Sequence, residues 1–539
     1  MLTTSPIKSI LHLPLRVLLL ILDSDVLSYQ DILACKQVCK LLRRIIDGTP
    51  SLQYKILLAA TGMDDMKTYS LSAAKKLAKL RQYEAAWADL FSPRPYKSSI
   101  PILGEPGWEF FGGVFAQFLD EHTIQFIRPR FHIRGVKEDM WALSLSLSLS
   151  SFYMDPYQDL LMVVVCDEGL HCLHLLDIHT GSKHALAKMQ RLLIPADEDA
   201  DFEINSFGNK VVMLIRWEEE ELPRSRLAIW DWQLGIPILV RVIYCLLRHS
   251  YVSALQIYDN SPDLDGKIGT DYVTFTFLDS DRIVFSVCDY TPRRGFQNGR
   301  LVVIDLALGS HAFSDALTFQ LPELADDCRI SELTLFRKCS LATPAAGTCR
   351  VPFRGSQEKA AIFIHYSISN VSTGEAEVIT IVLPTCKLLF LCDEYGSASA
   401  SQDVPRAVLW DLWGPKNTRA LVNLDAEYQA VFGTRLLCVQ DDYVTLYDFN
   451  HLGALSDLTL SLTRCMGEDD DCDPLKLATQ FKSPSTIKSK MLAQELTTTL
   501  PYRVLSTGMM YDESHTLMFS EDTVIIMNDT NKENVVYSI

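Results

Sequence analysis

The sequence has 539 residues, several times the length of a typical domain, so the chain folds as several domains or as one large repeat architecture. Apolar residues make up 48% of it and charged residues 22%, a composition that excludes a disordered, fibrous or membrane-embedded chain. Asp and Glu number 67 against 50 Lys and Arg, and the net charge of −17 disfavours nucleic acid and anionic lipid as partners.

The cysteines and the N-terminal apolar run bear on the compartment. The fourteen cysteines are scattered and form no CxxC pair, as is typical of free thiols in a reducing compartment. The apolar run at residues 10–22 is interrupted by His12, Pro14 and Arg16 and falls short of the roughly 20 residues of a membrane span. We therefore expect a cytoplasmic or nuclear protein, or one found in both, without a membrane partner.

The first ninety residues have the three- and four-residue apolar spacing of helices. Pro14 opens the first predicted helix, because a proline loses no hydrogen bond in a first turn. Ser28 and Asp31 form a capping-box pair that predicts the start of a second helix. A third helix is predicted to end near Gly48, and a further helix, over residues 71–91, reads as a linker.

From about residue 100 onward, short β-rich runs separated by turn residues predict a large all-β region. One pattern recurs in it: an apolar or aromatic residue, Asp or Asn four residues later, and Gly four residues after that. Asp and Asn accept backbone N–H bonds in turns and Gly adopts positive φ, so the pattern predicts the points where strands end. It is complete or nearly so at Leu173–Gly181, Leu227–Gly235, Leu301–Gly309, Tyr366–Gly374, Val444–Gly453 and Val524–Asn528.

Most copies of this pattern follow an apolar run, which predicts antiparallel hairpins. The predicted partner strands are Leu160–Cys166, Lys210–Trp217, Arg282–Cys288 and Arg435–Gln440. With residues 115–149 as a further unit, these repeats favour a β-propeller of seven blades. Two packed β-sandwich domains are the alternative. The alternating segment Leu143–Ser150 predicts one strand with a single apolar face.

Residues 11–57 resemble an F-box. The order and spacing of three segments carry the resemblance: Leu13-Pro14 with residues 17–22, Leu27 with residues 31–33, and residues 38–46. Two places depart from the family pattern: Leu15-Arg16 replaces an acidic residue common after Leu-Pro, and Gln53-Tyr54 stands where a tryptophan is common. The rest of the chain is similar to a fungal lineage of F-box proteins with a long β-rich C-terminal region, on the segments Thr61–Met63, Tyr83–Trp87, Asp155–Leu161 and Ile229–Trp232.

The resemblance implies a substrate-recognition adaptor of a Skp1–cullin–F-box ubiquitin ligase, acting in ubiquitin-dependent degradation without a catalytic residue, cofactor or metal. A Skp1-like protein, and through it a cullin, would be the partners, together with a target protein of unknown identity. In the family the F-box helices pack on the C-terminal helices of Skp1, which implies contacts from Leu13, Pro14, Val17, Leu18, Ile21, Leu33, Val38 and Leu42. The expected domains are an F-box at 8–57, a helical linker at 58–97 and a β-propeller-like target-binding domain at 98–539.

Three alternatives remain open at this point. The helices could be a cap packed on the β region, or the chain could be a Skp1-binding scaffold that delivers no target. A propeller-type hydrolase with an incidental helical cap is the third.

Other clusters are weaker candidates for a site. His171, His174, His179 and His184 fall on two faces of a hairpin and do not favour a shared metal. The acidic runs Glu218–Glu221 and Glu468–Asp471 with Asp473 are interpreted as solvated loops. Trp230, Trp232, Trp410 and Trp413 could line a binding surface or the core.

Overall fold

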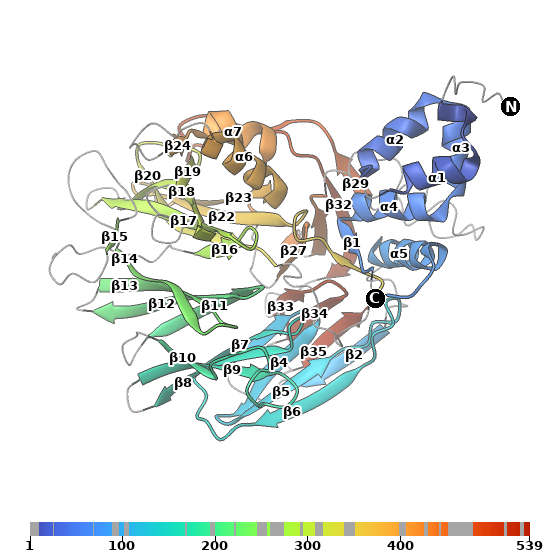
Figure 1. The fold of residues 1–539 in the computed structure, drawn as a ribbon. Coiled ribbons are helices and arrows are strands. Elements are labelled where there is room, and N and C mark those ends of the chain that lie inside the picture. The colour runs from blue at the N-terminus through green and yellow to red at the C-terminus, as the bar shows by residue number, and fades with distance from the viewer. Residues whose placement is uncertain are drawn as a thin grey trace.

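The computed structural model describes residues 10–24, 26–67, 69–88, 96–101, 107–167, 170–194, 200–219, 222–244, 256–258, 274–291, 295–307, 316–338, 351–397, 406–424, 430–440, 443–450, 478–510, 515–528 and 533–538. A helical module at the N-terminal end projects from one side of a much larger β region (Figure 1). This is the predicted order of an α-helical part followed by an all-β part built of many sheets.

The helical module consists of a short 3₁₀ turn and four α-helices, of which the fourth was not predicted. The elements are η1 (Ile10–His12), α1 (Leu15–Leu22), α2 (Tyr29–Val38), α3 (Lys40–Gly48) and α4 (Pro50–Thr61). The predicted capping box is confirmed, since Asp31 N donates to Ser28 Oγ and Ser28 N donates to the Asp31 carboxylate. Pro50 stands at the first turn of α4, where its missing N–H costs nothing, so it starts a helix as well as following the end of α3.

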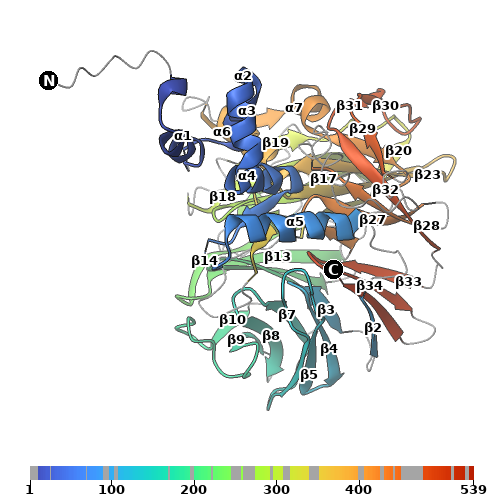
Figure 2. The ribbon, with the colours of Figure 1, turned by 90° about the vertical axis from the view of Figure 1, so that its right-hand side faces the viewer.

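The linker is more than a helix. After α4 the chain forms β1 (Met63–Asp65) and then α5 (Ala73–Ala88), which lies alongside α4 (Figure 2). Strand β1 pairs antiparallel with β21 (Phe353–Gly355), a strand nearly 300 residues later in the chain. The predicted end of the linker helix, at residue 91, lies outside the described residues.

The first three sheets of the β region follow one another in sequence. They have the strand orders β3-β4-β5-β6, β10-β9-β8-β7 and β11-β12-β13-β14-β15. Their strands are β3 (Trp108–Phe111), β4 (Val114–Asp120), β5 (Thr123–Arg128), β6 (Asp139–Ser144), β7 (Ser151–Asp155), β8 (Leu160–Asp167), β9 (Leu170–Asp177), β10 (Arg191–Ile194), β11 (Asp201–Phe207), β12 (Lys210–Glu219), β13 (Leu222–Asp231), β14 (Ile236–Tyr244) and β15 (Gln256–Tyr258).

The next sheet has nine strands, and two helices lie in the chain between β23 and its last strand. Its two halves join through β18 and β20, which pair only at Phe296 and Ile330. The strands are β16 (Phe275–Phe277), β17 (Arg282–Thr291), β18 (Gly295–Asp305), β19 (Leu317–Gln320), β20 (Cys328–Phe336), β22 (Ala361–Asn370), β23 (Ala376–Pro384), β24 (Arg406–Val408) and β25 (Arg419–Val422), and the helices are α6 (Thr385–Ser397) and α7 (Trp410–Asn417). The helices were not predicted; Leu388, Leu391 and Trp413 pack them on this sheet.

Three further sheets complete the β region. Their strand orders are β26-β27-β28-β32-β29, β30-β31 and β2-β35-β34-β33. The strands are β2 (Tyr96–Pro101), β26 (Val431–Phe432), β27 (Arg435–Gln440), β28 (Tyr443–Asp448), β29 (Ala478–Phe481), β30 (Ser485–Ile487), β31 (Leu496–Thr498), β32 (Tyr502–Met510), β33 (His515–Phe519), β34 (Thr523–Asn528) and β35 (Glu533–Ser538). Strand β2, from the start of the β region, therefore pairs with β35 at its end.

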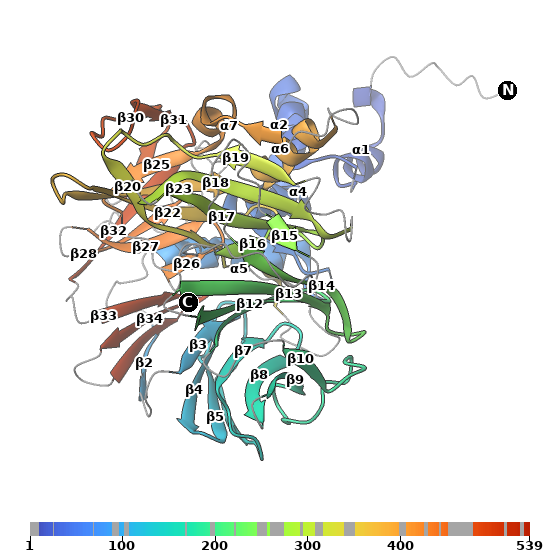
Figure 3. The same cartoon turned by 90° about the vertical axis from the view of Figure 1, so that its left-hand side faces the viewer.

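Successive sheets lie beside one another (Figure 3), and buried side chains from several of them form shared cores. One core joins Phe111, Val163, Val212 and Phe285, which come from four successive sheets. Another joins Phe110 and Phe115 of the first sheet to Met518 and Ile525 of the last, a contact in addition to the β2–β35 pairing.

The recurring Asp/Asn pattern is confirmed as a mark of strand ends. Strands β9, β13, β18, β22, β28 and β34 end at Asp177, Asp231, Asp305, Asn370, Asp448 and Asn528. At Asn370 the side-chain oxygen accepts from Ser372 N and Thr373 N, and Gly374 follows with φ of 73°. Each predicted partner strand pairs antiparallel with the marked strand that follows it. Gly309 and Gly453 lie outside the described residues.

The prediction of one strand over Leu143–Ser150 is wrong. Strand β6 ends at Ser144, and the next residues turn back so that Leu145 N donates to His122 O and Leu149 N to Glu121 O. Leu143 and Leu149 are still buried in the shared core. Period-two burial thus occurs here without strand pairing, because irregular backbone can also point alternate side chains inward.

Candidate partner-docking surface

Helix α1 is apolar on more of its circumference than the module buries. Arg16 is its only charged residue, yet only Leu18 and Leu22 are buried. Leu20 lies on the opposite side of the helix and is 74% exposed, and Leu15, in the first turn, is also exposed. Exposed apolar groups gathered on one element mark a surface that a partner covers.

The neighbouring elements of the module also carry exposed apolar side chains. Val26 lies in the α1–α2 connection, Val38 ends α2 and Leu41 stands in the first turn of α3. Val26 is 89% and Val38 71% exposed. We call these residues, with the exposed side chains of α1, the apolar surface of the module: Leu15, Val17, Leu20, Ile21, Val26, Val38 and Leu41.

The structure separates the residues predicted to contact Skp1 into two groups. Pro14, Val17, Ile21 and Val38 are exposed, and Leu13 and Leu33 are half-buried. Leu18 and Leu42 are buried within the chain itself, at 4% and 6% exposure. In this structure Leu18 and Leu42 are therefore buried residues of the module and not part of its exposed surface.

Sequence reasoning passed over Leu15, Leu20, Val26 and Leu41. A signal was present for Leu20: it lies about half a turn from Leu18 and Leu22, so it faces away from them. A helix that is apolar on both sides needs a second apolar contact.

A small core holds the module together. It contains Leu22, Ile32, Leu42, Ile46, Leu52 and Ile56, so every helix contributes. Polar contacts fix the helix ends: Lys36 of α2 pairs with Asp47 of α3 at 2.6 Å, and Lys55 of α4 donates to Ser24 O at 2.9 Å.

Helix α4 belongs to two cores at once. Leu52 and Ile56 face the module, whereas Tyr54, Leu57 and Leu58 pack with residues of the β region. The Tyr54 hydroxyl donates to Asp65 Oδ1 at 3.0 Å, and Asp65 also pairs with Lys76 of α5 at 2.7 Å. Burial and the adjacent Asp65 carboxylate raise the pKa of the Tyr54 hydroxyl. The module is therefore held to the β region through packed side chains.

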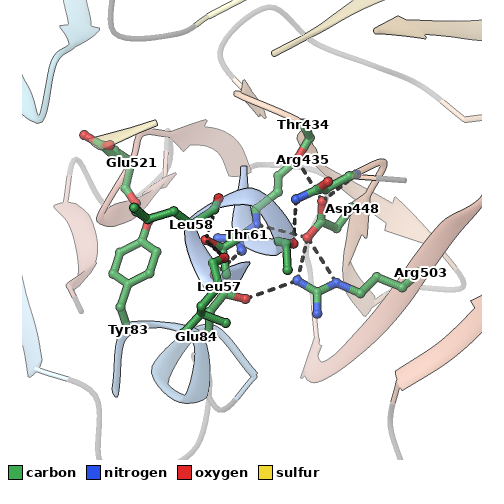
Figure 4. A network of polar contacts seen from close by, with 12 residues as sticks. Leu57, Leu58, Thr61, Tyr83, Glu84, Thr434, Arg435, Asp448, Arg503 and Glu521 are labelled. Carbon is green, nitrogen blue, oxygen red and sulfur yellow. Dashed lines mark hydrogen bonds and ion pairs between the residues drawn. The ribbon is translucent and has the colours of Figure 1, made fainter. Parts of the chain in front are cut away.

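A buried ion-pair network ties α5 to three strands (Figure 4). Glu84 of α5 contacts Arg435 of β27 at 2.9 Å and Arg503 of β32 at 3.3 Å. Asp448, at the end of β28, contacts Arg503 at 2.6 Å and accepts from Thr434 Oγ1. Burial alone would raise the pKa of Asp448, but Arg503 and Arg435 hold it well below its ordinary value.

The same strand end also reaches α4. Asn450 Nδ2 donates to Ala60 O at 2.7 Å, and Asn450 N donates to Asp448 Oδ1 at 3.0 Å. A second buried cluster lies nearby: Arg134 contacts Glu521 and Asp522, and Tyr83 of α5 donates to Glu521 O. Ion pairs and hydrogen bonds therefore hold both α4 and α5 to the β region.

The β region contains a cavity of about 480 Å³. It is lined by strands of five successive groups, β3, β7, β11, β16 and β20, with Glu109, Asp201, Glu203, Arg216 and Arg337 among the lining residues. Arg216 pairs with Glu203 at 2.5 Å across neighbouring strands. Burial raises the pKa of Glu109 and of Glu203.

The other sequence candidates are structural where they are described. Trp230, Trp232, Trp410 and Trp413 are all buried in cores. His184 is buried with Nε2 2.9 Å from Gln158 O. Within the described ranges, no three His, Cys, Asp or Glu side chains come close enough to hold a metal ion. The acidic residues 468–471 and 473, with Glu220 and Glu221, lie outside the described residues.

No helix in the described part of the chain is long and apolar enough to cross a membrane.

In the comparison with known proteins, one family model matches the residues of this module. No curated protein matches the chain. Among solved structures, an uncharacterized protein from Listeria monocytogenes EGD-e aligns over 82% of this chain and 94% of the Listeria chain. The two chains are 9% identical and the TM-score is 0.33, a distant similarity. A family model described as F-box-like matches residues 10–59, from η1 almost to the end of α4. The chain therefore contains an N-terminal F-box-like domain.

Proposed function

We propose that the protein is a substrate-recognition adaptor of a Skp1–cullin–F-box ubiquitin ligase, of the fungal type that its sequence resembles. Its F-box-like domain would bind a Skp1-like protein, and its β region would bind a target in the cytoplasm or the nucleus. The observation that carries the proposal is the coincidence of the F-box-like match at 10–59 with an exposed apolar surface on the same helices. F-box domains typically bind Skp1 in such complexes.

The β region is proposed to be a seven-bladed propeller. Support comes from a succession of seven strand groups, with the nine-stranded sheet counted as two halves that join through Phe296 and Ile330. The groups are β3–β6, β7–β10, β11–β15, β16–β19, β20 with β22, β23 and β25, β26–β29 with β32, and β33–β35. The pairing of β2 with β35 would close the ring with the first and last strands, and the shared core of the first and last sheets agrees with this. Two separate sandwiches would not need either contact.

The mechanism would be proximity. An adaptor raises the effective concentration of a target lysine at the charged conjugating enzyme, and needs no reacting side chain for it. The position of α4 supports this mechanism, because the helix packs both in the core of the F-box-like domain and against the β region. A target held by the β region would keep a fixed distance from Skp1.

Point variants test the proposal better than truncation. Removing residues 1–57 would take Tyr54 and Leu57 out of the core shared with the β region. The exposed Leu20→Asp and Val38→Asp leave both cores intact, and Leu186→Asp, at an exposed leucine of the β9–β10 connection, is the matched control. We expect the wild-type chain and the control to co-purify with Skp1 and the two variants to lose it.

The alternatives give different results. The adaptor proposal fails if Skp1 co-purifies equally with the wild-type chain and both surface variants, or if it does not co-purify with the wild-type chain. A Skp1-binding scaffold would bind Skp1 while no protein accumulates on the chain when the proteasome is inhibited. A hydrolase would act through groups such as Glu109 and Glu203, and its activity would be unaffected by Leu20→Asp.

A further inference from the structure

The cavity in the β region has the size and position of a recognition site. Its volume of about 480 Å³ lies within the range of small-ligand pockets. The first strands of five groups line it, so its wall comes from residues more than 200 positions apart and would be stable only in the assembled β region. The proposed adaptor role leaves this cavity without an assigned purpose.

The charged groups in the wall divide into those engaged and those open to a ligand. Arg216 pairs with Glu203 at 2.5 Å. The Arg337 guanidinium donates to Thr385 Oγ1 at 3.1 Å and to Gln357 O at 3.0 Å. Within the described residues Asp201 and Glu109 form no ion pair closer than 4 Å, and Asp201 is exposed.

One cation lies behind this wall. Lys338 is buried and donates to Phe110 O at 3.1 Å, and its charge acts on the adjacent Glu109. It does not line the cavity. The lining itself therefore holds more carboxylates than cations, with both of its guanidinium groups already bonded to the wall.

Aromatic rings complete the lining. Trp108, Phe202 and Phe336 are half-buried and border the cavity. Ring faces and carboxylates together bind organic cations, the first through cation–π attraction and the second through charge-assisted hydrogen bonds. A planar guanidinium uses both better than an ammonium does, since it stacks on rings and forks onto carboxylates.

We propose that this cavity binds an arginine side chain of the target protein, with Asp201 and Glu109 as its acidic contacts. The inference rests on the proposed adaptor function and names the chemistry of the target that the β region accepts. The net charge of −17 would also steer a basic segment toward the protein.

The test measures binding of a fluorescent acetyl-Gly-Gly-Arg-Gly-Gly amide to the full chain by anisotropy. The comparison peptide carries citrulline, which keeps the planar shape but lacks the charge. The variants are Glu109→Gln and the exposed Asp201→Asn, which is not expected to disturb folding, and the control is Glu138→Gln, an exposed carboxylate outside the cavity. We expect about tenfold weaker binding for the citrulline peptide and for Glu109→Gln, a several-fold loss for Asp201→Asn and no change for the control.

Several results would overturn the inference: no binding by the wild-type chain, equal binding of both peptides, an equal loss in Glu138→Gln, or cleavage of the peptide. Skp1 binding, measured on the same samples, distinguishes a failure of the arginine-binding proposal from a failure of the adaptor proposal. Glu109→Gln should leave Skp1 bound, whereas Leu20→Asp should release Skp1 and leave peptide binding unchanged.

Discussion

At the scale of single residues, two leucines of α1 that are two positions apart have opposite roles. Leu18 is buried and Leu20 is exposed. We expect Leu18→Asp to destabilise the module by roughly 3 kcal/mol or more, because it places an unpaired charge inside, and Leu20→Asp to leave stability unchanged. Thermal unfolding followed by circular dichroism distinguishes the two, and equal unfolding temperatures would show that Leu18 is not buried as described.

The ion-pair network is predicted to depend on Glu84. Glu84→Gln leaves Arg435 and Arg503 with one carboxylate fewer in a buried site, and should cost about 3 kcal/mol of unfolding free energy. Denaturant unfolding measures the loss, with the exposed Glu138→Gln as the control. An unchanged midpoint would mean that the network adds nothing to stability.

Asp448 predicts a pH dependence of the same network. Its pKa is lower in the folded chain than in the unfolded one, so its contribution is complete above the ordinary Asp pKa of about 4 and is lost as the pH falls below it. Between pH 6 and pH 3 the wild-type chain should lose more stability than Asp448→Asn. Parallel curves for the two proteins would contradict this.

At the scale of elements, the connection between α4 and β1 depends on Gly62. Gly62 has φ of 71°, and a Cβ there would lie 3.4 Å from Asn450 Nδ2. Gly62→Ala should therefore cost about 1 kcal/mol. Gly48→Ala is the matched control, since Gly48 ends α3 without positive φ and a Cβ added there would have no atom within 4 Å. Equal unfolding temperatures for the two variants would refute the prediction.

The sequence predicted those elements that carry local signals. The capping box located α2, and Asp or Asn followed by Gly located strand ends, because these side chains and backbone angles act within a few residues. Helix α4 was missed because Pro50 was interpreted only as a stop. Helices α6 and α7 were missed because packing on the long sheet, through residues such as Leu388 and Trp413, decides their place.

At the scale of the whole molecule, the pairing of β2 with β35 is predicted to make the two ends of the β region one cooperative unit. Those amides of residues 96–100 that bond to β35 should exchange with solvent as slowly as the amides of residues 533–538. Hydrogen exchange read by mass spectrometry checks this. Exchange of residues 96–101 within seconds, with 533–538 protected, would contradict a closed ring.

Long-range contacts also explain why the apolar surface and the cavity were not predicted from the sequence. The apolar surface follows from which side of α1 packs inward, and that is decided by Ile32, Leu52 and Ile56 on other helices. The cavity brings Glu109 and Arg337 into one wall across more than 200 residues of chain. The cavity has no local sequence pattern. For the apolar surface, the sequence shows only that α1 is apolar on both sides and does not show which side packs inward.

The most direct test of the account is the affinity of the full chain for purified Skp1, measured by calorimetry. We predict binding by the wild-type chain, unchanged affinity for Leu186→Asp, and a loss of about 100-fold or more for Leu20→Asp and Val38→Asp, as expected when a charge enters a desolvated apolar contact. Wild-type affinity in both surface variants, or no binding by the wild-type chain, would contradict the claim that this surface docks Skp1.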